Sequence, residues 1–117
     1  MHMPSLEIFA SYFFLIQLIH SFEELSTGFH KRWYLFKMPF RVFLGFEVLF
    51  NLFWAIVLLS KQFPERQILL AIFIVLMFAN GIQHLVWFGW EKKYVPGLLT
   101  APLHVILFLL FYFQMIF

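Results

Sequence analysis

The sequence contains no cysteine and few charged residues, and both shortages narrow what the protein can be. Without cysteine, disulfide bonds and thiolate chemistry are excluded. Charged residues occupy 12% of the 117 positions, about half of the roughly 25% that is typical of a soluble domain. Apolar residues occupy 63% and include nineteen phenylalanines, more than a core of this size can hide from water. The composition therefore excludes an ordinary soluble domain and indicates an integral membrane protein.

Four apolar stretches are each long enough to cross a bilayer, which takes about 20 residues in a helix. They are residues 5–25, 40–60, 67–90 and 97–117. Because lipid offers no hydrogen-bond partners to an open backbone, each stretch is predicted to be helical. Short connections make neighbouring helices antiparallel. We therefore predict an all-α polytopic membrane protein in which residues 1–117 form a single domain, an antiparallel four-transmembrane-helix bundle.

The basic residues are distributed unevenly over the connections between these stretches. The first and third connections contain or adjoin Lys31, Arg32, Lys37, Arg41, Lys92 and Lys93, whereas only Lys61 and Arg66 flank the second. By the positive-inside rule, the first and third connections are predicted to be cytoplasmic and both termini to lie outside. The expected location is the inner (plasma) membrane of a bacterium. The basic excess then reflects membrane topology, and no nucleic-acid partner is expected.

Polar residues inside the predicted helices follow helical spacing. His20, Glu23 and Glu24 are related by i, i+3 and i+4, so they share one face of the first helix. The same i, i+4 spacing joins Glu47 to Asn51, Asn80 to His84 and Thr100 to His104. Each predicted helix therefore carries a polar face, although the surrounding sequence is apolar.

These ionisable residues also lie at a shared depth. At 1.5 Å per residue, the deep members are roughly 8 to 11 Å from the cytoplasmic ends of their helices. They are His20, Glu47, His84 and His104. An ionisable group left in hydrocarbon costs about 2.5 to 3.5 kcal/mol on insertion scales, so such residues normally face the interior of a bundle. We therefore expect them to converge on one pocket in the cytoplasmic half of the membrane.

Three short motifs follow one another along the chain. HSFEE (His20 to Glu24) fits HxxEE, NGIQH (Asn80 to His84) fits NxxxH, and YVPGLLT (Tyr94 to Thr100) fits YxPGxxT. Together they resemble the signature of the HXXEE family of small predicted four-helix membrane proteins. The resemblance brings no established function, but signature residues of catalytic type imply an enzyme. The candidate catalytic residues that it implies are Glu23, Glu24, Asn80, Tyr94 and Thr100.

The predicted pocket contains enough nitrogen and oxygen donors for one metal ion or two. The candidate ligands are His20, Glu23, Glu24, Glu47, His84 and His104. Histidine and carboxylate at i, i+3 or i+4 spacing hold the metals of di-iron and di-manganese bundle proteins. Zinc would take such donors in a tetrahedral arrangement, and iron or manganese would accept the same ligands. A divalent metal is therefore the expected cofactor, with Asn80 hydrogen bonded to a ligating histidine or to the substrate.

The same motifs also have a purely structural interpretation. In this interpretation Glu23 and Glu24 are solvated at a helix end, and Asn80 hydrogen bonds a neighbouring helix. Thr100 caps the fourth helix after a Pro-Gly turn. If that helix begins at Thr100, its free amides suit an anionic group such as a phosphate or a carboxylate.

Three classes of function fit these features. The leading hypothesis is a membrane enzyme whose metal activates water or oxygen against a lipid-like or isoprenoid substrate, with Glu23 or Glu24 as general base. The second is a metal-free His/Glu acid-base enzyme of isomerase, cyclase or hydrolase type. The third is proton or ion transport, or a scaffold. Membrane lipid is an expected partner in each, and the small residues Gly45, Ala79 and Gly81 permit association with further copies.

Overall fold

The structure is a computed structural model that describes residues 3–116. Over this range the chain forms helices and no strand. The helices are α1 (Met3–Ser26), α2 (Phe29–Arg32), α3 (Phe40–Leu59), α4 (Arg66–Glu91) and α5 (Ala101–Ile116). The all-α prediction is confirmed. By length and composition α1, α3 and α4 are candidate membrane spans, and α5 is a shorter apolar helix.

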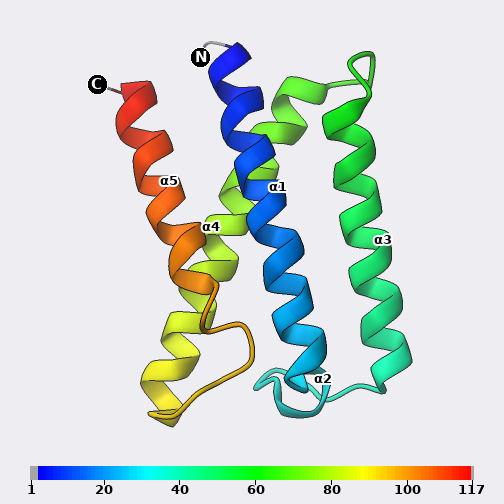
Figure 1. Cartoon of the computed structure of the whole chain (residues 1–117), viewed down its shortest axis with the longest axis vertical. Coiled ribbons are helices and arrows are strands. Elements are labelled where there is room, and N and C mark those ends of the chain that lie inside the picture. Colours follow the sequence, from blue (N-terminus) through cyan, green and yellow to red (C-terminus); the bar gives the residue numbers. More distant parts are fainter. Residues whose placement is uncertain (1–2, 117) are drawn as a thin grey trace.

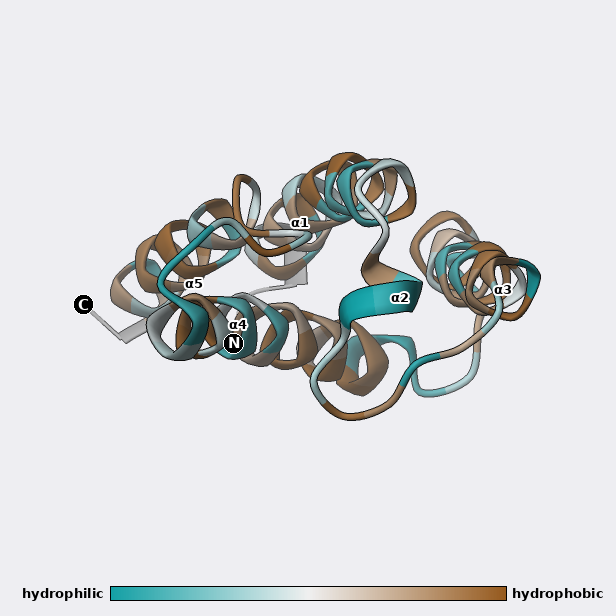
Figure 2. Ribbon diagram, turned by 90° about the horizontal axis from the view of Figure 1, so that it is seen from below, coloured by the Kyte–Doolittle hydropathy of each residue, from teal (hydrophilic) through white to brown (hydrophobic). Residues whose placement is uncertain are grey.

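The two ends of the chain lie at the same end of the molecule (Figure 1). From there α1 and α4 run toward the opposite end, and α3 and α5 run back (Figure 1). Helix α1 contacts α3, α4 and α5, and α4 also packs along α5. Helix α3 lies to one side of the others, and α2 lies in the space between α3 and the rest (Figure 2).

Two apolar clusters are separated by a polar layer. The larger cluster lies toward the chain termini and includes Leu6, Phe13, Trp54, Phe73 and Phe111. The smaller one consists of Phe29, Phe43, Trp87 and Val95. In a membrane these contacts gain little from the hydrophobic effect, because lipid is as apolar as the protein core. Close packing and polar contacts must therefore hold the helices together.

Arg66, at the start of α4, joins three helices near the chain termini. It is 7% exposed, and its Nε donates to the Val57 carbonyl at 2.8 Å while Nη2 donates to the Leu58 carbonyl at 2.5 Å. Its Nη1 pairs with the Glu7 carboxylate of α1. The last carbonyls of a helix have no partners within the helix. Arg66 therefore caps α3 and ties it to α1 and α4.

Replacing Arg66 by methionine is expected to lower the free energy of unfolding by about 1 to 3 kcal/mol, because buried acceptors lose their donors. The measurement is denaturation in detergent micelles followed by circular dichroism. Lys61→Met is the control, since Lys61 Nζ is 3.9 Å from Glu7 and its side chain is 77% exposed. An exposed pair of this kind contributes about 0 to 1 kcal/mol. Equal losses of unfolding free energy in the two variants would contradict the role of Arg66 in joining α3 to α1 and α4.

The fourth predicted helix begins later than the sequence suggested. Residues 97–117 were expected to be helical, but α5 begins at Ala101 and is 16 residues long. Gly97 has a φ of +93°, and the Leu98 and Ala101 amides donate to the Val95 and Gly97 carbonyls, each at 3.0 Å. Residues 95–100 therefore form successive turns. The predicted stretches 5–25, 40–60 and 67–90 end within two residues of α1, α3 and α4.

Gly81 allows α4 and α5 to approach closely. A Cβ added at Gly81 would lie 2.8 Å from the Ala101 carbonyl oxygen, so no larger residue fits without a shift of α5. Gly81 therefore serves the packing of α4 against α5 within one chain. A Cβ at Gly45 would meet no atom within 4 Å, so the surface of α3 around Gly45 is open.

Candidate metal centre

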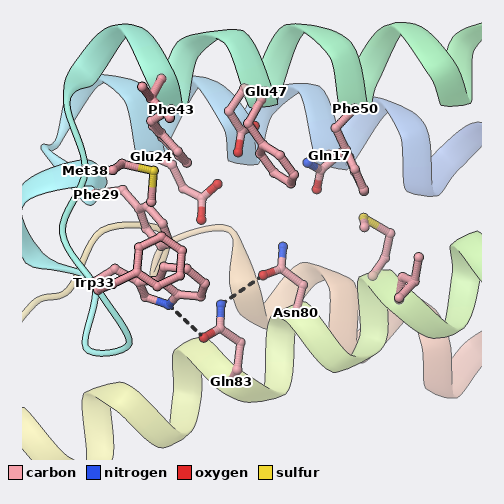
Figure 3. Close-up of a pocket in the computed structure, with 15 residues that line it drawn as sticks. Gln17, Glu24, Phe29, Trp33, Met38, Phe43, Glu47, Phe50, Asn80 and Gln83 are labelled. Carbon is pink, nitrogen blue, oxygen red and sulfur yellow. Dashed lines mark hydrogen bonds between the residues drawn. The ribbon is translucent and has the colours of Figure 1, made fainter.

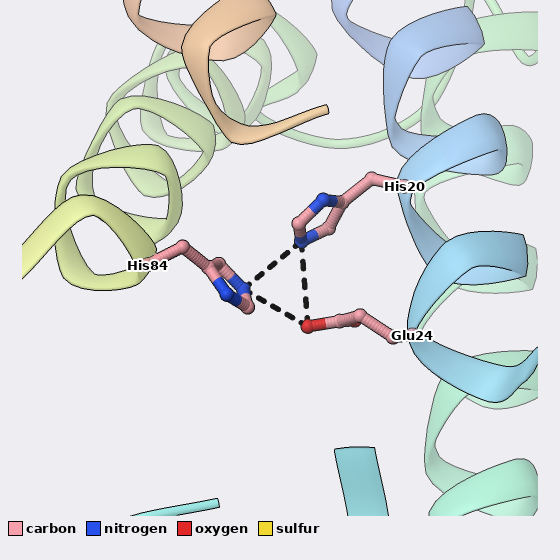
Figure 4. A group of neighbouring side chains, drawn as sticks. All are labelled: His20, Glu24 and His84. Atoms are coloured by element: carbon pink, nitrogen blue, oxygen red, sulfur yellow. Dashed lines mark hydrogen bonds and ion pairs between the residues drawn. The ribbon is translucent and has the colours of Figure 1, made fainter. Parts of the chain in front are cut away.

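His20 and Glu24 on α1 and His84 on α4 bring three donor atoms together (Figure 4). His20 Nε2 lies 3.1 Å from His84 Nε2 and 3.3 Å from Glu24 Oε2. His84 Nε2 lies 3.0 Å from the same carboxylate oxygen. Both imidazoles are fully buried, and Glu24 is 4% exposed. Because His20 and Glu24 are four residues apart, one face of α1 supplies two of the three donors.

The three separations match three corners of a tetrahedron around one ion. With metal–ligand bonds of about 2.0 to 2.1 Å, tetrahedral geometry places neighbouring ligand atoms about 3.3 Å apart. The observed range of 3.0 to 3.3 Å requires only a small expansion. Two histidines and one glutamate are also the ligand set of a class of catalytic zinc sites, in which water takes the fourth position. These residues therefore fit a divalent ion in both geometry and chemistry.

Glu23 turns away from this group toward the turns before α5. Its carboxylate accepts hydrogen bonds from the Leu99 and Thr100 amides, each at 3.0 Å. It also accepts from the Thr100 hydroxyl at 2.7 Å and from the Tyr94 hydroxyl at 2.5 Å. A carboxylate offers about four acceptor sites, so Glu23 has little capacity left to bind a metal or to act as a base. The amides that were expected to suit an external anion bind Glu23 instead.

Tyr94 serves this arrangement as a hydrogen-bond donor. Burial and the hydrogen bond to Glu23 raise the pKa of the Tyr94 hydroxyl above its ordinary value. At neutral pH the phenol is therefore protonated and donates to Glu23. The structure places Tyr94 against a carboxylate of the protein, and not in the group formed by His20, Glu24 and His84.

Thr100 connects Glu23 to His20 and determines which nitrogen of His20 carries the proton. Its hydroxyl has one proton, which goes to Glu23 at 2.7 Å, since the other acceptor, the Gly97 carbonyl, is at 3.4 Å. The hydroxyl oxygen must then accept from His20 Nδ1, which is 2.5 Å away. In the neutral imidazole, Nε2 is left with a free lone pair. That lone pair faces His84 and Glu24, as a metal ligand requires.

Gly97 packs directly on the two imidazoles. A Cβ at this position would lie 2.7 Å from His84 Nδ1 and 2.8 Å from His20 Cε1. Its φ of +93° is also one that residues with a side chain rarely adopt. Glycine is therefore required here for two independent reasons. The sequence indicated the turn, but not the contact with the histidines.

Glu47 and His104 lie beside the group without joining it. Glu47 accepts from the Ser21 hydroxyl at 2.5 Å and interacts with the Glu24 carboxylate. The His104 ring centroid is 5.2 Å from that of His20, and neither His104 nitrogen has a hydrogen-bond partner within residues 3–116. Of the predicted ligands, the structure gathers His20, Glu24 and His84, and places Glu23, Glu47 and His104 outside.

The solvated helix-end interpretation of Glu23 and Glu24 is wrong. The two residues are 8% and 4% exposed, so neither carboxyl group is solvated at a helix end. The two carboxylates are neighbours in sequence but face different partners. Glu24 faces the two imidazoles, and Glu23 orients His20 through Thr100.

A cavity of about 460 Å³ lies next to the candidate metal ligands His20, Glu24 and His84, which we call the metal group. It lies between α1, α3 and α4 (Figure 3). This volume is within the range of about 300 to 1,000 Å³ that small-molecule sites occupy. Its wall is mostly apolar and includes Phe29, Trp33, Phe43, Phe46 and Phe50. Its polar lining residues are Gln17, Glu24, Glu47, Asn80 and Gln83. Glu24 therefore belongs to both the metal group and the cavity wall.

Ser21 organises one side of this cavity, and the sequence analysis missed it. Its hydroxyl accepts from Gln17 Nε2 at 3.1 Å and from Asn51 Nδ2 at 2.9 Å, and it donates to Glu47. The i, i+4 relation between Gln17 and Ser21 was the available signal. Ser21 thus fixes the orientation of the Glu47 carboxyl.

Asn80 lines the cavity and is hydrogen bonded to Gln83, not to a histidine, within residues 3–116. Its Oδ1 accepts from Gln83 Nε2 at 3.1 Å, and its amide nitrogen points into the cavity (Figure 3). Of the two roles expected for Asn80, the hydrogen bond to a ligating histidine is not formed within residues 3–116, and the hydrogen bond to a substrate stays a prediction. Thr100 is the residue that makes this contact with His20.

Comparison with known proteins gives one match. The family model described as "Protein of unknown function with HXXEE motif" covers residues 11–112. No curated protein and no solved structure shows significant similarity to the chain. The matched region contains the metal group, the turns before α5 and the whole cavity lining. The chain therefore belongs to the HXXEE family of proteins of unknown function.

Proposed function

We propose that this protein is a small membrane enzyme that binds one divalent metal ion through His20, Glu24 and His84. Zinc fits best, with iron or manganese as the alternatives. The observation that carries the proposal is the buried triangle of donor atoms with sides of 3.0 to 3.3 Å. A metal held in this way makes bound water reactive at neutral pH by lowering its pKa.

The proposal includes a lipid-like or isoprenoid substrate. The cavity lies between three helices that are candidate membrane spans, so it can be filled from the bilayer. Aromatic and aliphatic side chains from these helices would contact an aliphatic chain, and Asn80 would hydrogen bond its polar end. Glu24 would hold the metal at the boundary between the metal group and the cavity.

Glu47 is the proposed proton-transfer group, in place of Glu23. It is 5% exposed, lines the cavity and is not a member of the metal group. Its carboxyl is held by Ser21 beside Glu24, so it could exchange a proton with a substrate that reaches the candidate metal ligands. Glu23, with its acceptor sites filled, positions His20 and does not exchange protons with a substrate.

The proposed membrane arrangement is an antiparallel bundle in which α5 crosses as a fourth span. Its 16 residues are fewer than the usual number of about 20, so the turns formed by residues 95–100 would occupy the remaining depth. The basic residues near α2 and after α4 favour a cytoplasmic location for that end. The metal group then lies in the cytoplasmic half of a bacterial inner membrane.

The metal content of the purified protein tests this proposal. Protein prepared without added metal is expected to contain about one transition-metal ion per chain by elemental analysis. His20→Ala and His84→Ala should lose it, because two protein ligands rarely hold such an ion. His104→Leu is the matched control: it removes a buried histidine of the same layer and should keep the metal. A wild-type protein without stoichiometric metal, or equal loss in His104→Leu, contradicts the proposal.

A metal-free acid-base enzyme is the second candidate. It is favoured by the direct contact of Glu24 Oε2 with His84 Nε2 at 3.0 Å, which is a hydrogen-bond distance without any ion. In that case His84 Nε2 must carry a proton, because His20 Nε2 and Glu24 are both acceptors. With metal bound, neither Nε2 carries a proton. Nitrogen NMR of labelled histidine separates the two candidates by the protonation of His84 Nε2.

A further inference from the structure

The polar groups of the cavity are mostly hydrogen-bond acceptors. The carboxyl groups of Glu24 and Glu47 line it, and within residues 3–116 no lysine, arginine or histidine belongs to its lining. A buried site for an anionic group normally contains a basic side chain or several free amides that converge on it. The amides before α5 are not free for such a group, because they donate to the Glu23 carboxylate. The cavity therefore does not match a phosphate or a carboxylate.

Gln17 supplies a further acceptor that the protein itself leaves unpaired. The side chain is 3% exposed, and its Nε2 donates to Ser21 at 3.1 Å. Its Oε1 is buried without a hydrogen-bond partner among the residues described. A buried acceptor without a hydrogen-bond partner carries a free-energy cost. Gln17 lines the cavity (Figure 3), so a donor group on a bound molecule would remove this cost.

Glu47 lies on the same side of the cavity as Gln17. Ser21 holds both residues: it accepts from Gln17 and donates to Glu47 at 2.5 Å. The two acceptors are therefore fixed in relation to each other before any ligand binds. Across the cavity, the Asn80 amide nitrogen is a donor that points inward (Figure 3). An amino group can donate to both acceptors, and a hydroxyl group can donate to one of them while it accepts from Asn80.

We infer that the cavity binds an aliphatic molecule whose polar end is a hydroxyl or amino group without negative charge, held by Gln17 and Glu47. The aliphatic part lies along the aromatic wall. This inference rests on the proposed function only in placing the substrate in this cavity. A carboxylate or phosphate head is rejected, because it would offer no proton to Gln17 and would lie beside two buried carboxylates. Like charges brought together at such a contact oppose binding.

Ligands of equal chain length test the inference. Trp33 lines the cavity, so tryptophan emission reports binding, and Trp33→Phe should remove the signal. Decanol, decylamine and decanoate are titrated into the protein as purified, in lipid nanodiscs, with empty nanodiscs as the partition control. Decanol and decylamine are expected to bind at least tenfold more tightly than decanoate. Equal binding of the three, or tighter binding of decanoate, overturns the inference.

Two variants assign the selectivity to named residues. Gln17→Met keeps the size of the side chain and removes its acceptor, so decanol should bind about tenfold more weakly. Glu47→Gln replaces the carboxyl group by an amide that can donate to an anionic head, so the preference over decanoate should shrink toward one. His104→Leu, outside the cavity, should change neither. Selectivity that is unchanged in both cavity variants contradicts the inference.

The outcome is independent of the metal proposal. The titrations are repeated after treatment with a chelator, and the metal content is measured on the same samples. Selectivity without stoichiometric metal would remove the metal proposal and keep this inference. Stoichiometric metal without selectivity would keep the metal proposal and overturn this inference.

Discussion

Gly97→Ala is expected to abolish metal binding and to lower the free energy of unfolding by about 2 to 4 kcal/mol. The added methyl group would lie 2.7 Å from His84 Nδ1 and 2.8 Å from His20 Cε1, so both imidazoles must move. The φ of +93° adds backbone strain for any residue with a Cβ. Metal content and denaturation in detergent measure the two effects.

Gly89→Ala is the matched control for this substitution. Gly89 lies within α4, and a Cβ there would meet no atom within 4 Å. Alanine is more favourable than glycine in a helix, and Gly89 lies in the last turn of α4, so this variant should be as stable as the wild type or slightly more so. If Gly97→Ala retains full metal content, or if the two variants behave alike, the packing of the turn on the histidines is not essential.

Thr100→Val is expected to weaken metal binding by about 10- to 100-fold, the usual effect of removing a hydrogen bond that orients a ligating histidine. Valine keeps the shape of threonine but removes the hydroxyl that accepts from His20 Nδ1. His20 would then no longer be held in the tautomer that presents a free Nε2. Competition titration against a chelator of known affinity measures the change.

Thr100→Ser separates the role of the hydroxyl from that of packing. Serine keeps the hydroxyl and removes a methyl group, so it should retain most of the metal affinity. Nitrogen NMR provides a second measurement, with His20 Nδ1 protonated in the wild type and in Thr100→Ser. If serine weakens binding as much as valine does, or if valine has no effect, the link from Glu23 through Thr100 to His20 does not orient the ligand.

The helices and three members of the metal group could be predicted because they depend on local spacing. Helical periodicity places His20 and Glu24 one turn apart, and the depth of His84 in the third predicted helix brings it to the same level. The sequence alone could not show which of Glu23 and Glu24 faces the imidazoles. They are adjacent and lie about 100° apart around the helix axis, so only the positions of neighbouring elements decide which one faces the imidazoles.

The neighbouring element that decides between Glu23 and Glu24 is the segment that includes Gly97 and Thr100. Its turn was predictable, but its contacts with α1 join residues about 80 positions apart in the chain, and no periodicity reports such contacts. His104 shows the same limit. Depth placed it correctly in the polar layer, and its ring lies 5.2 Å from that of His20, but neither of its nitrogens joins the group formed by His20, Glu24 and His84.

X-ray absorption at the edge of the bound metal, on protein purified without added ions, tests the central claim most directly. The account predicts two imidazole nitrogens at about 2.0 to 2.1 Å, one carboxylate oxygen at about 2.0 to 2.2 Å and one further oxygen. It also predicts that this signal disappears in His84→Ala and persists in His104→Leu. A spectrum with one imidazole or none, or one that survives loss of His84, would contradict the site formed by His20, Glu24 and His84.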